Sequence, residues 1–201
     1  MPPAPTYSRR ALLKLATSTA VFAALRPMAA LAADDTPPPF EIEFPQDPWQ
    51  TVFVDSFGFS RSGGRRHQGN DLMAPKMTPV YAIASGRITS VEDGGIAGRR
   101  VIIDHGNGFE SWYLHLNNDT PGTDDGRADW ADTVMVYVAE GMPVAGGTQI
   151  AWVGDSGNAE WVGSHTHFEL HWRGRAIDPY PYLKPAYDRA RVHTPRTLDV
   201  I

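Results

Sequence analysis

The chain has no cysteine in 201 residues, which excludes disulfide bonds and thiolate metal sites. Any bound metal ion must therefore be held by histidine, aspartate or glutamate. An excess of basic residues is also missing, because 18 lysines and arginines face 23 acidic residues and the net charge is -5. This balance lacks the electrostatic footprint of a nucleic-acid binder, so no nucleic-acid partner is expected.

Long hydrophobic runs are also missing from the chain. The apolar segment Ala11–Leu25 is short for a hydrocarbon core of about 30 Å, and Arg26-Pro27 interrupts it. Arg9-Arg10 precedes this segment, and Ala30-Leu31-Ala32 offers small residues to a signal peptidase. The sequence predicts a twin-arginine signal peptide over residues 1–32 and export from a bacterium, to the periplasm or the cell exterior. The alternative is a retained anchor; after cleavage no membrane contact is expected.

Removal of residues 1–32 takes away four basic residues and no acidic one, which moves the net charge from -5 to -9. The mature part of about 169 residues suits one domain with its own core. We expect a proline-rich leader at 33–50, the folded domain at 51–185 and a polar tail at 186–201. The oligomeric state is open, with a monomer as the default.

Helical periodicity is nearly absent between Val52 and Leu183, where short apolar runs alternate with turn-forming residues. The Asn107-Gly108 pair predicts a tight hairpin. Strands are expected at Val80–Ile83, Arg87–Val91, Arg100–Asp104, Phe109–Tyr113, Thr133–Val138, Gln149–Val153 and His165–Trp172. The pattern predicts an all-β fold, an antiparallel sandwich or open barrel with long loops.

Two histidine motifs carry candidate metal chemistry. His67 and Asp71 are four residues apart, which fits one helix face, but Gly69 and Asn70 between them favour a loop or an irregular strand end. Neutral imidazole and carboxylate oxygen are ligands of catalytic zinc. The H-x-x-x-D spacing alone leaves a metal site and an accidental match both open.

The second motif is His165-Thr166-His167 on a predicted strand. Alternation along a strand places His165 and His167 on one face and directs Phe168 and Leu170 into the core. Two imidazoles side by side on a strand can meet one metal ion or one substrate.

Seven stretches together resemble the LytM/lysostaphin-type zinc endopeptidases of bacterial cell walls. The similarity runs in the family's order over about residues 55–183. It rests on His67–Leu72 with Thr78–Ala82, Ile103–Gly108, Tyr113–Leu116, Gly154–Asn158, His165–Leu170 and Asp178–Leu183.

The resemblance implies that His67, Asp71 and His167 bind Zn²⁺, and that His115 and His165 are catalytic histidines that are not ligands. The implied substrate is a peptide bond in peptidoglycan. The two catalytic histidines would orient or deprotonate the attacking water, stabilise the tetrahedral intermediate and protonate the leaving amine. Which histidine performs which step stays open, and so does the bond that is cut, in a glycine bridge or a D-alanyl cross-link.

Other polar residues are given simpler interpretations. His105 is expected to be structural, and His171 to lie behind the ligands or at the surface. Glu169 is expected either to contact a ligand histidine or to be solvated. An acidic insertion at 117–132 begins just after His115, so it is expected to form one wall of the groove. Its spacing misses the D-x-D-x-D-G pattern of calcium loops, which favours a solvated loop.

Two further functions stay open. One is a non-catalytic module that binds the wall or regulates a hydrolase on the same fold. The other is a secreted zinc peptidase that acts on proteins. Because all five family positions are present, the enzyme is the favoured hypothesis.

Overall fold

The protein was analysed as a computed structural model that describes residues 37–193. The predicted signal peptide, the start of the predicted leader and residues 194–201 of the predicted tail lie outside these residues. The fold described here belongs to the unit that begins at Pro38. Within the described part of the chain, no helix has the length and apolar character needed to cross a membrane.

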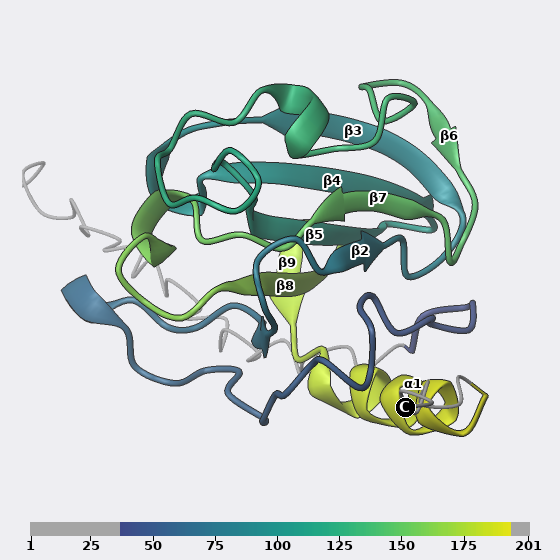
Figure 1. Ribbon diagram of the computed structural model, residues 1–201. Helices are drawn as coiled ribbons and strands as arrows, with labels where there is room; N and C mark the ends of the chain where they lie inside the picture. Colours follow the sequence, from purple (N-terminus) through teal and green to yellow (C-terminus); the bar gives the residue numbers. More distant parts are fainter. Residues whose placement is uncertain (1–36, 194–201) are drawn as a thin grey trace, which may run out of the picture. The chain divides into compact units, whose positions relative to one another are not determined.

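The centre of the fold is a seven-stranded antiparallel sheet (Figure 1). Its strands follow the spatial order β1-β8-β5-β4-β3-β6, and β9 pairs with β8. A second, two-stranded sheet contains β2 and β7, and both sheets contribute to one hydrophobic core. The strands are β1 (Asn70–Met73), β2 (Pro79–Tyr81), β3 (Gly86–Glu92), β4 (Arg99–Gly106), β5 (Phe109–Leu116), β6 (Pro143–Val144), β7 (Gln149–Trp152), β8 (His165–Trp172) and β9 (Arg175–Ile177). The sheet is antiparallel and open rather than a closed barrel, as the apolar runs predicted.

The hairpin between β4 and β5 turns where the sequence predicted it. Asn107 and Gly108 both have positive φ, 54° and 81°, and Gly106 pairs with Phe109 across the turn. A two-residue turn of this hand matches the twist of the flanking strands, and asparagine and glycine adopt it most readily. The turn therefore fixes the register between β4 and β5.

The strand predicted at Thr133–Val138 is not formed. The segment instead follows the short 3-10 helix η3 (Trp130–Asp132) and makes one isolated bridge, Val134 with Ala151. The amide of Val138 donates to the carbonyl of Met135, which closes a turn inside the predicted strand. The other short 3-10 helices are η1 (Ser62–Gly64), η2 (Gly95–Ala97) and η4 (Gly157–Ala159).

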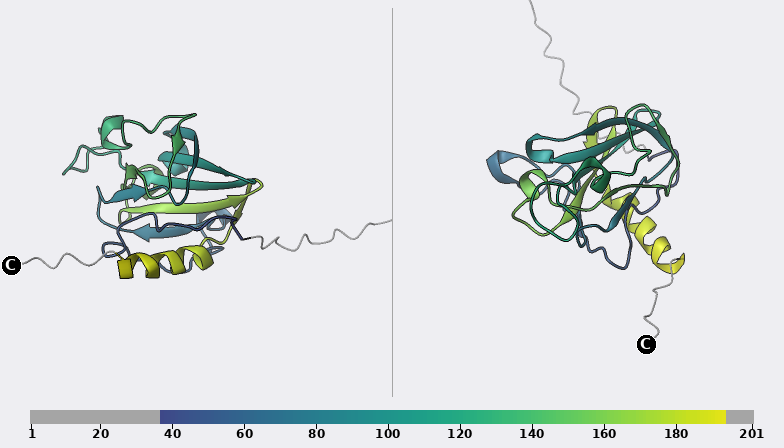
Figure 2. Two further views of the ribbon diagram at one scale, coloured as in Figure 1. Left: turned by 90° about the vertical axis from the view of Figure 1, so that its right-hand side faces the viewer. Right: turned by 45° about the horizontal axis from the view of Figure 1, so that its top comes forward.

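A C-terminal helix, α1 (Tyr180–His193), crosses the boundary expected between domain and tail at 185/186 (Figures 1 and 2). Leu183 and Ala186 are buried in the common core, so the first part of the expected tail is integral to the fold. Pro181 lies in the first turn, where no amide hydrogen is needed. Pro185 lies inside the helix and removes a hydrogen bond, which the buried side chains offset.

The predicted leader also packs onto the domain, which corrects the expectation of a separate extended segment. Ile42 and Phe44 are buried in the core, and the Phe44 ring meets Tyr187 of α1 at 5.0 Å between centroids. The amide of Tyr81 in β2 donates to the carbonyl of Pro45 at 2.8 Å. Proline cannot donate a backbone hydrogen bond but can accept one, so this proline-rich segment still pairs with a strand edge.

Candidate metal centre

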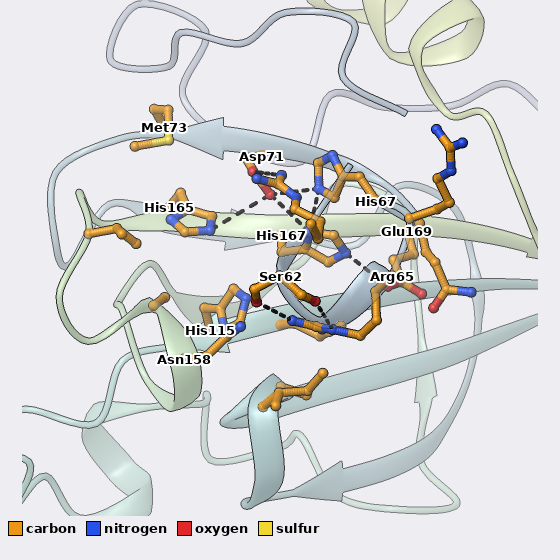
Figure 3. Close-up of a pocket in the computed structure, with 18 of the residues that line it drawn as sticks. Ser62, Arg65, His67, Asp71, Met73, His115, Asn158, His165, His167 and Glu169 are labelled. Atoms are coloured by element: carbon orange, nitrogen blue, oxygen red, sulfur yellow. Dashed lines mark hydrogen bonds and ion pairs between the residues drawn. The ribbon is translucent and has the colours of Figure 1, made fainter. Parts of the chain in front are cut away.

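Three ligand atoms from distant parts of the sequence converge on one point (Figure 3). His67 Nε2 lies 2.9 Å from His167 Nδ1 and 3.0 Å from Asp71 Oδ1, and the last two atoms are 2.8 Å apart. An ion can touch all corners of so small a triangle at the ligand distances of zinc, about 2.0–2.2 Å. Two imidazoles and one carboxylate, with one side facing a pocket, are a donor set that suits catalytic zinc.

The sheet register positions two of the three groups. Asp71 in β1 is the direct partner of His167 in β8, so their side chains leave neighbouring strands at the same height. His67 lies in the loop before β1, the irregular setting that Gly69 and Asn70 predicted. A Cβ on Gly69 would lie 2.0 Å from the carbonyl oxygen of Phe168, so only glycine lets this loop approach β8 so closely.

Hydrogen bonds fix the rings of both histidines. The Nδ1 atom of His67 lies 2.9 Å from the carbonyl oxygen of Ser56, which takes the N–H of that ring and leaves Nε2 free for a metal. The Nε2 atom of His167 lies 2.8 Å from Glu169 Oε1, so Nδ1 is the free atom there. Glu169 therefore contacts this histidine rather than lying in solvent, which decides between the two expectations for it.

Glu169 also connects His167 to His171. The Oε2 atom of Glu169 lies 2.6 Å from His171 Nε2, and the His171 ring stacks on Trp112 at 4.4 Å and 9°. His171 is thus buried behind the candidate ligands and not at the surface. Burial raises the pKa of Glu169, but the hydrogen bonds from His167 and His171 outweigh it and lower the pKa to about 2. The carboxylate stays ionised at neutral pH.

The electrostatics of the cluster favour a cation. Burial would raise the pKa of Asp71, yet the side chains of His167 and His67, each with a ring nitrogen within 3.0 Å of its Oδ1, hold it well below its usual range. Burial would lower the pKa of His167, but Asp71 and Glu169 raise it. A carboxylate that is ionised at neutral pH, beside two imidazoles, is the state in which these side chains bind a metal.

The two other predicted site histidines lie beside the cluster. The His115 ring is 5.1 Å from that of His165 and 5.8 Å from that of His167, centroid to centroid. Each ring is held at Nδ1 by a carbonyl, from Ser156 at 2.9 Å for His115 and from Gly163 at 2.8 Å for His165. Nε2 is therefore the atom that each ring can offer to a substrate or a water.

Both rings are neutral at pH 7. Burial, assisted by His165 and His167, lowers the pKa of His115 to about 4, and burial likewise lowers the pKa of His165. His115 also has φ of 61°, a conformation that is unfavourable for a bulky residue. Backbone strain of this kind is characteristic of functional sites.

All five histidine and aspartate positions line one cavity of about 550 Å³. Arg61 and Arg65, which the sequence reasoning missed, also line it, and Arg61 Nη2 lies 2.5 Å from Asp71 Oδ2. The only local signal was the cluster of arginines before His67. His105 lies away from the cavity and bonds to the Ser85 carbonyl and the Ser111 hydroxyl, in agreement with a structural role.

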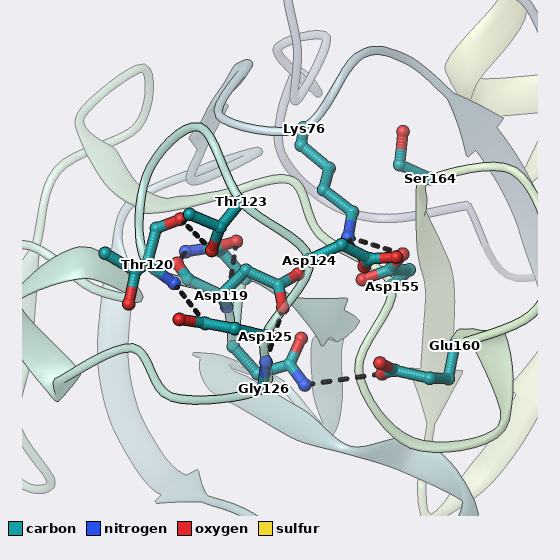
Figure 4. Close-up of polar contacts among 12 residues, drawn as sticks. Lys76, Asp119, Thr120, Thr123, Asp124, Asp125, Gly126, Asp155, Glu160 and Ser164 are labelled. Carbon is teal, nitrogen blue, oxygen red and sulfur yellow. Dashed lines mark hydrogen bonds and ion pairs between the residues drawn. The ribbon is translucent and has the colours of Figure 1, made fainter.

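The acidic insertion does not form a wall of this cavity, because no residue of 117–132 lines it. It is instead drawn to the domain by Lys76 (Figure 4). Lys76 Nζ lies 2.7 Å from Asp119, 2.5 Å from Asp124 and 2.8 Å from Asp155. The lysine ammonium supplies the positive charge among these carboxylates.

Comparisons of sequence and of fold with known proteins both lead to peptidases of one type. Residues 65–126 match the model of peptidase family M23. The chain is 31% identical over 112 residues to the peptidoglycan DD-endopeptidase ShyA of Vibrio cholerae, which covers 56% of this chain and 22% of that protein. It is 35% identical over 121 residues to the DD-carboxypeptidase/endopeptidase Mpg of Neisseria meningitidis, covering 60% and 24%. The murein hydrolase activator NlpD of Escherichia coli is 27% identical over 137 residues, covering 68% and 30%. The chain thus spans less than a third of the length of each of these relatives.

Solved structures share the fold. The catalytic domain of lysostaphin from Staphylococcus simulans is 25% identical with a TM-score of 0.54, and the match covers 70% of this chain and 98% of that one. A putative glycyl-glycine endopeptidase LytM from Ruminococcus gnavus is 25% identical with a TM-score of 0.60, covering 75% and 62%.

Proposed function

Because this chain belongs to the M23 peptidases of the LytM/lysostaphin type, we propose that it is an exported zinc endopeptidase that cuts peptide bonds in peptidoglycan stem or cross-bridge peptides. The observation that carries the proposal is the convergence of His67, Asp71 and His167 beside two neutral histidines in one cavity. The similarity to ShyA, a peptidoglycan DD-endopeptidase, and to Mpg, a DD-carboxypeptidase/endopeptidase, supports peptidoglycan as the substrate class.

The metal and the protein side chains have separate tasks. His67, Asp71 and His167 would hold the zinc ion, which would supply a Lewis acid to polarise a carbonyl and to lower the pKa of a water. Neutral His115 and His165 each present Nε2 to the cavity side of their rings, where it can accept a proton from the attacking water. The same atom, once protonated, can donate to the leaving amine or to the oxyanion of the tetrahedral intermediate.

The alternative is a module that controls another hydrolase, because one relative is a murein hydrolase activator. A complete set of ligand and non-ligand histidines favours the enzyme, since a binding module needs neither the neutral pair nor an open metal position. The two functions are separated by whether new peptide ends appear.

The first test is digestion of insoluble peptidoglycan by the purified chain without residues 1–32, with and without a zinc chelator. We expect new amino and carboxyl ends, identified by mass spectrometry, that disappear with chelator and return with added zinc. Binding to peptidoglycan without new ends, at full zinc occupancy, would support the regulatory module instead.

Substitution of His167 tests the ligand assignment. We expect His167→Ala to lose both stoichiometric zinc and cleavage, because one of three protein ligands is removed. Zinc content is measured by elemental analysis of the purified protein. A variant that still holds one zinc ion per chain would refute the role of His167.

Substitution of His115 tests the separation of tasks. We expect His115→Ala to keep zinc but to lower kcat by about 10²–10⁴-fold, the range for loss of a general acid or base. Turnover at the original rate would show that His115 is not catalytic.

A further inference from the structure

The cavity carries a surplus of positive charge in an otherwise acidic chain. Three arginines line it, Arg61, Arg65 and Arg66, although the net charge of the chain is -5. The two carboxylates that line it, Asp71 and Glu169, are both engaged by histidines. Asp71 also pairs with Arg61, and no acidic residue of the lining forms an ion pair with Arg65 or Arg66.

The loop before His67 places two of these arginines together. The amide of Arg61 donates to the carbonyl of Arg65 at 3.0 Å, which closes a turn around η1. Gly63 and Gly64 have φ of 70° and 74°, a conformation that other residues rarely adopt and that this closed turn uses. Arg61 and Arg65 therefore lie at the two ends of one turn at the cavity mouth (Figure 3 labels Arg65).

The two guanidinium groups differ in how they are satisfied. Arg61 is paired with Asp71, so its charge is matched inside the protein. Arg65 contacts only its own loop, with Nε 3.2 Å from the Ser62 carbonyl and Nη2 3.3 Å from the Ser62 hydroxyl. Among the described residues, no carboxylate forms an ion pair with Arg65. An unmatched guanidinium offers a planar fork of donors that fits a carboxylate with two parallel hydrogen bonds.

We propose that Arg65 binds a free carboxylate on the substrate peptide. The inference rests on the proposed function and names its substrate class: anionic stem-peptide cross-links rather than uncharged glycine bridges. Arg61 stays paired with Asp71 and is not part of the proposed carboxylate site. A surface arginine needs no ligand, but this one faces the cavity beside the metal centre, where a matched anion is missing.

The test compares two synthetic cross-linked peptides that differ only in this group. One carries its free carboxylates, and in the other they are converted to carboxamides. For the zinc-loaded enzyme we expect kcat/KM to favour the carboxylate peptide by about tenfold, the effect of one charge-assisted hydrogen bond. Arg65→Gln is expected to raise KM for the carboxylate peptide about tenfold, with kcat unchanged and the carboxamide peptide unaffected.

Two further variants sharpen the comparison. Arg65→Lys keeps the charge but loses the fork, so it should recover part of the preference. Arg127→Gln makes the same charge change on the insertion, away from the cavity lining, and should leave both peptides unaffected. If Arg127→Gln also removed the preference, net charge and not Arg65 would be responsible.

A binding measurement separates this inference from the proposed function. Metal-free protein is titrated with the two fluorescently labelled peptides, because zinc itself attracts carboxylates. We expect tighter binding of the carboxylate peptide, by about tenfold, and loss of that difference in Arg65→Gln. If neither peptide is cleaved but this difference is found, the enzyme proposal fails and the carboxylate site stands. Equal affinity of the wild-type protein for both peptides, or an equal loss for both in Arg65→Gln, overturns the inference.

Discussion

Glu169 is the residue on which the orientation of a proposed zinc ligand depends. Its two oxygens bridge His167 at 2.8 Å and His171 at 2.6 Å, so the carboxylate accepts the Nε2 proton of His167 and directs Nδ1 to the ligand cluster. Because the pKa of Glu169 is lowered to about 2, it remains a charged acceptor at any pH at which the enzyme is expected to work. A charged acceptor also makes the ligand imidazole more basic.

The substitution Glu169→Gln keeps the size of this side chain and removes its charge. We expect zinc affinity to fall by about tenfold to a hundredfold, as for other carboxylates behind ligand histidines. Competition with a chromophoric chelator measures the change. Glu110→Gln is the matched control, since Glu110 accepts a hydrogen bond from Trp112 Nε1 in the same strand, β5, and does not contact a proposed ligand. Equal zinc affinity in wild type and Glu169→Gln would show that Glu169 only fills space.

Among the elements, the acidic insertion has its buried ion pair with Lys76, and Arg99 also bonds to the carbonyl of its Ala128. The side chains of Asp119 and Asp155 are 2% and 6% exposed, and Lys76 bonds to both. Hydrogen bonds from Lys76 and from the Gly126 amide outweigh burial and lower the pKa of Asp119. At Asp155, burial raises the pKa by more than the hydrogen bond from Lys76 lowers it. The negative charges of Asp119 and Glu160 raise this pKa further. The pKa of Asp119 is thus lowered and that of Asp155 raised, so one ammonium does not fully compensate for the burial of two carboxylates.

Removal of that cation should therefore have a pH-dependent cost. We expect Lys76→Met to lower the free energy of unfolding at pH 7 by about 2–3 kcal/mol, because it leaves buried carboxylates without a partner. Without Lys76 their pKa values rise above those of the unfolded chain, so the folded variant takes up protons and gains stability as the pH falls from 7 to 5. The wild-type pair behaves differently. The lowered pKa of Asp119 means that this carboxylate stabilises the fold above its unfolded pKa and loses that contribution on acidification. The raised pKa of Lys76 means that this ammonium stabilises the fold below its unfolded pKa and loses its contribution only in strong alkali.

Urea unfolding of both proteins at pH 5 and pH 7 measures this difference. Lys184→Met is the matched control, because Lys184 pairs with Asp188 on the exposed side of α1. An exposed pair of this spacing contributes little to the free energy of unfolding, because solvent screens it. If Lys76→Met were no more destabilised than Lys184→Met, the insertion would be held by other contacts.

The elements also show what the sequence could and could not predict. Strand β8 has the predicted bounds, because its alternation places Phe168 and Leu170 in the core. Helix α1 was missed because Pro181 and Pro185 interrupt its sequence, whereas its burial depends on a tertiary contact through Leu183. The leader was misjudged for a similar reason, since proline content describes the backbone and not the core that buries Ile42.

The candidate site also contains residues that the sequence could predict and residues that it could not. The positions of His67, Asp71 and His167 were visible because few residue types bind zinc, and the structure places them together; their roles remain predictions. Arg65 was not visible, because most arginines in loops are solvated. Its place at the cavity depends on the turn at Gly63 and Gly64, a geometry that residue type does not specify.

At the scale of the whole molecule, a metal ion would connect segments that folding must bring together from far apart. His67 and His167 are 100 residues apart, and Asp71 and His167 are 96 apart. The unfolded chain cannot present these ligands in one place, so zinc should bind the folded state alone. A ligand with that selectivity stabilises the fold by mass action, by about 2.7 kcal/mol at a free concentration of 100 times its Kd.

We therefore expect zinc to raise the Tm of the metal-free protein by about 5–10 °C at that concentration, since 1 kcal/mol shifts a chain of this size by about 2–4 °C. Differential scanning calorimetry with and without a chelator measures the shift independently of any substrate. His167→Ala should abolish the shift and His115→Ala should retain it, because only the first is a proposed ligand. If both variants kept the shift, zinc would bind elsewhere on the molecule. If both lost it, His115 would belong to the ligand set and the separation of ligand from catalytic histidines would be wrong.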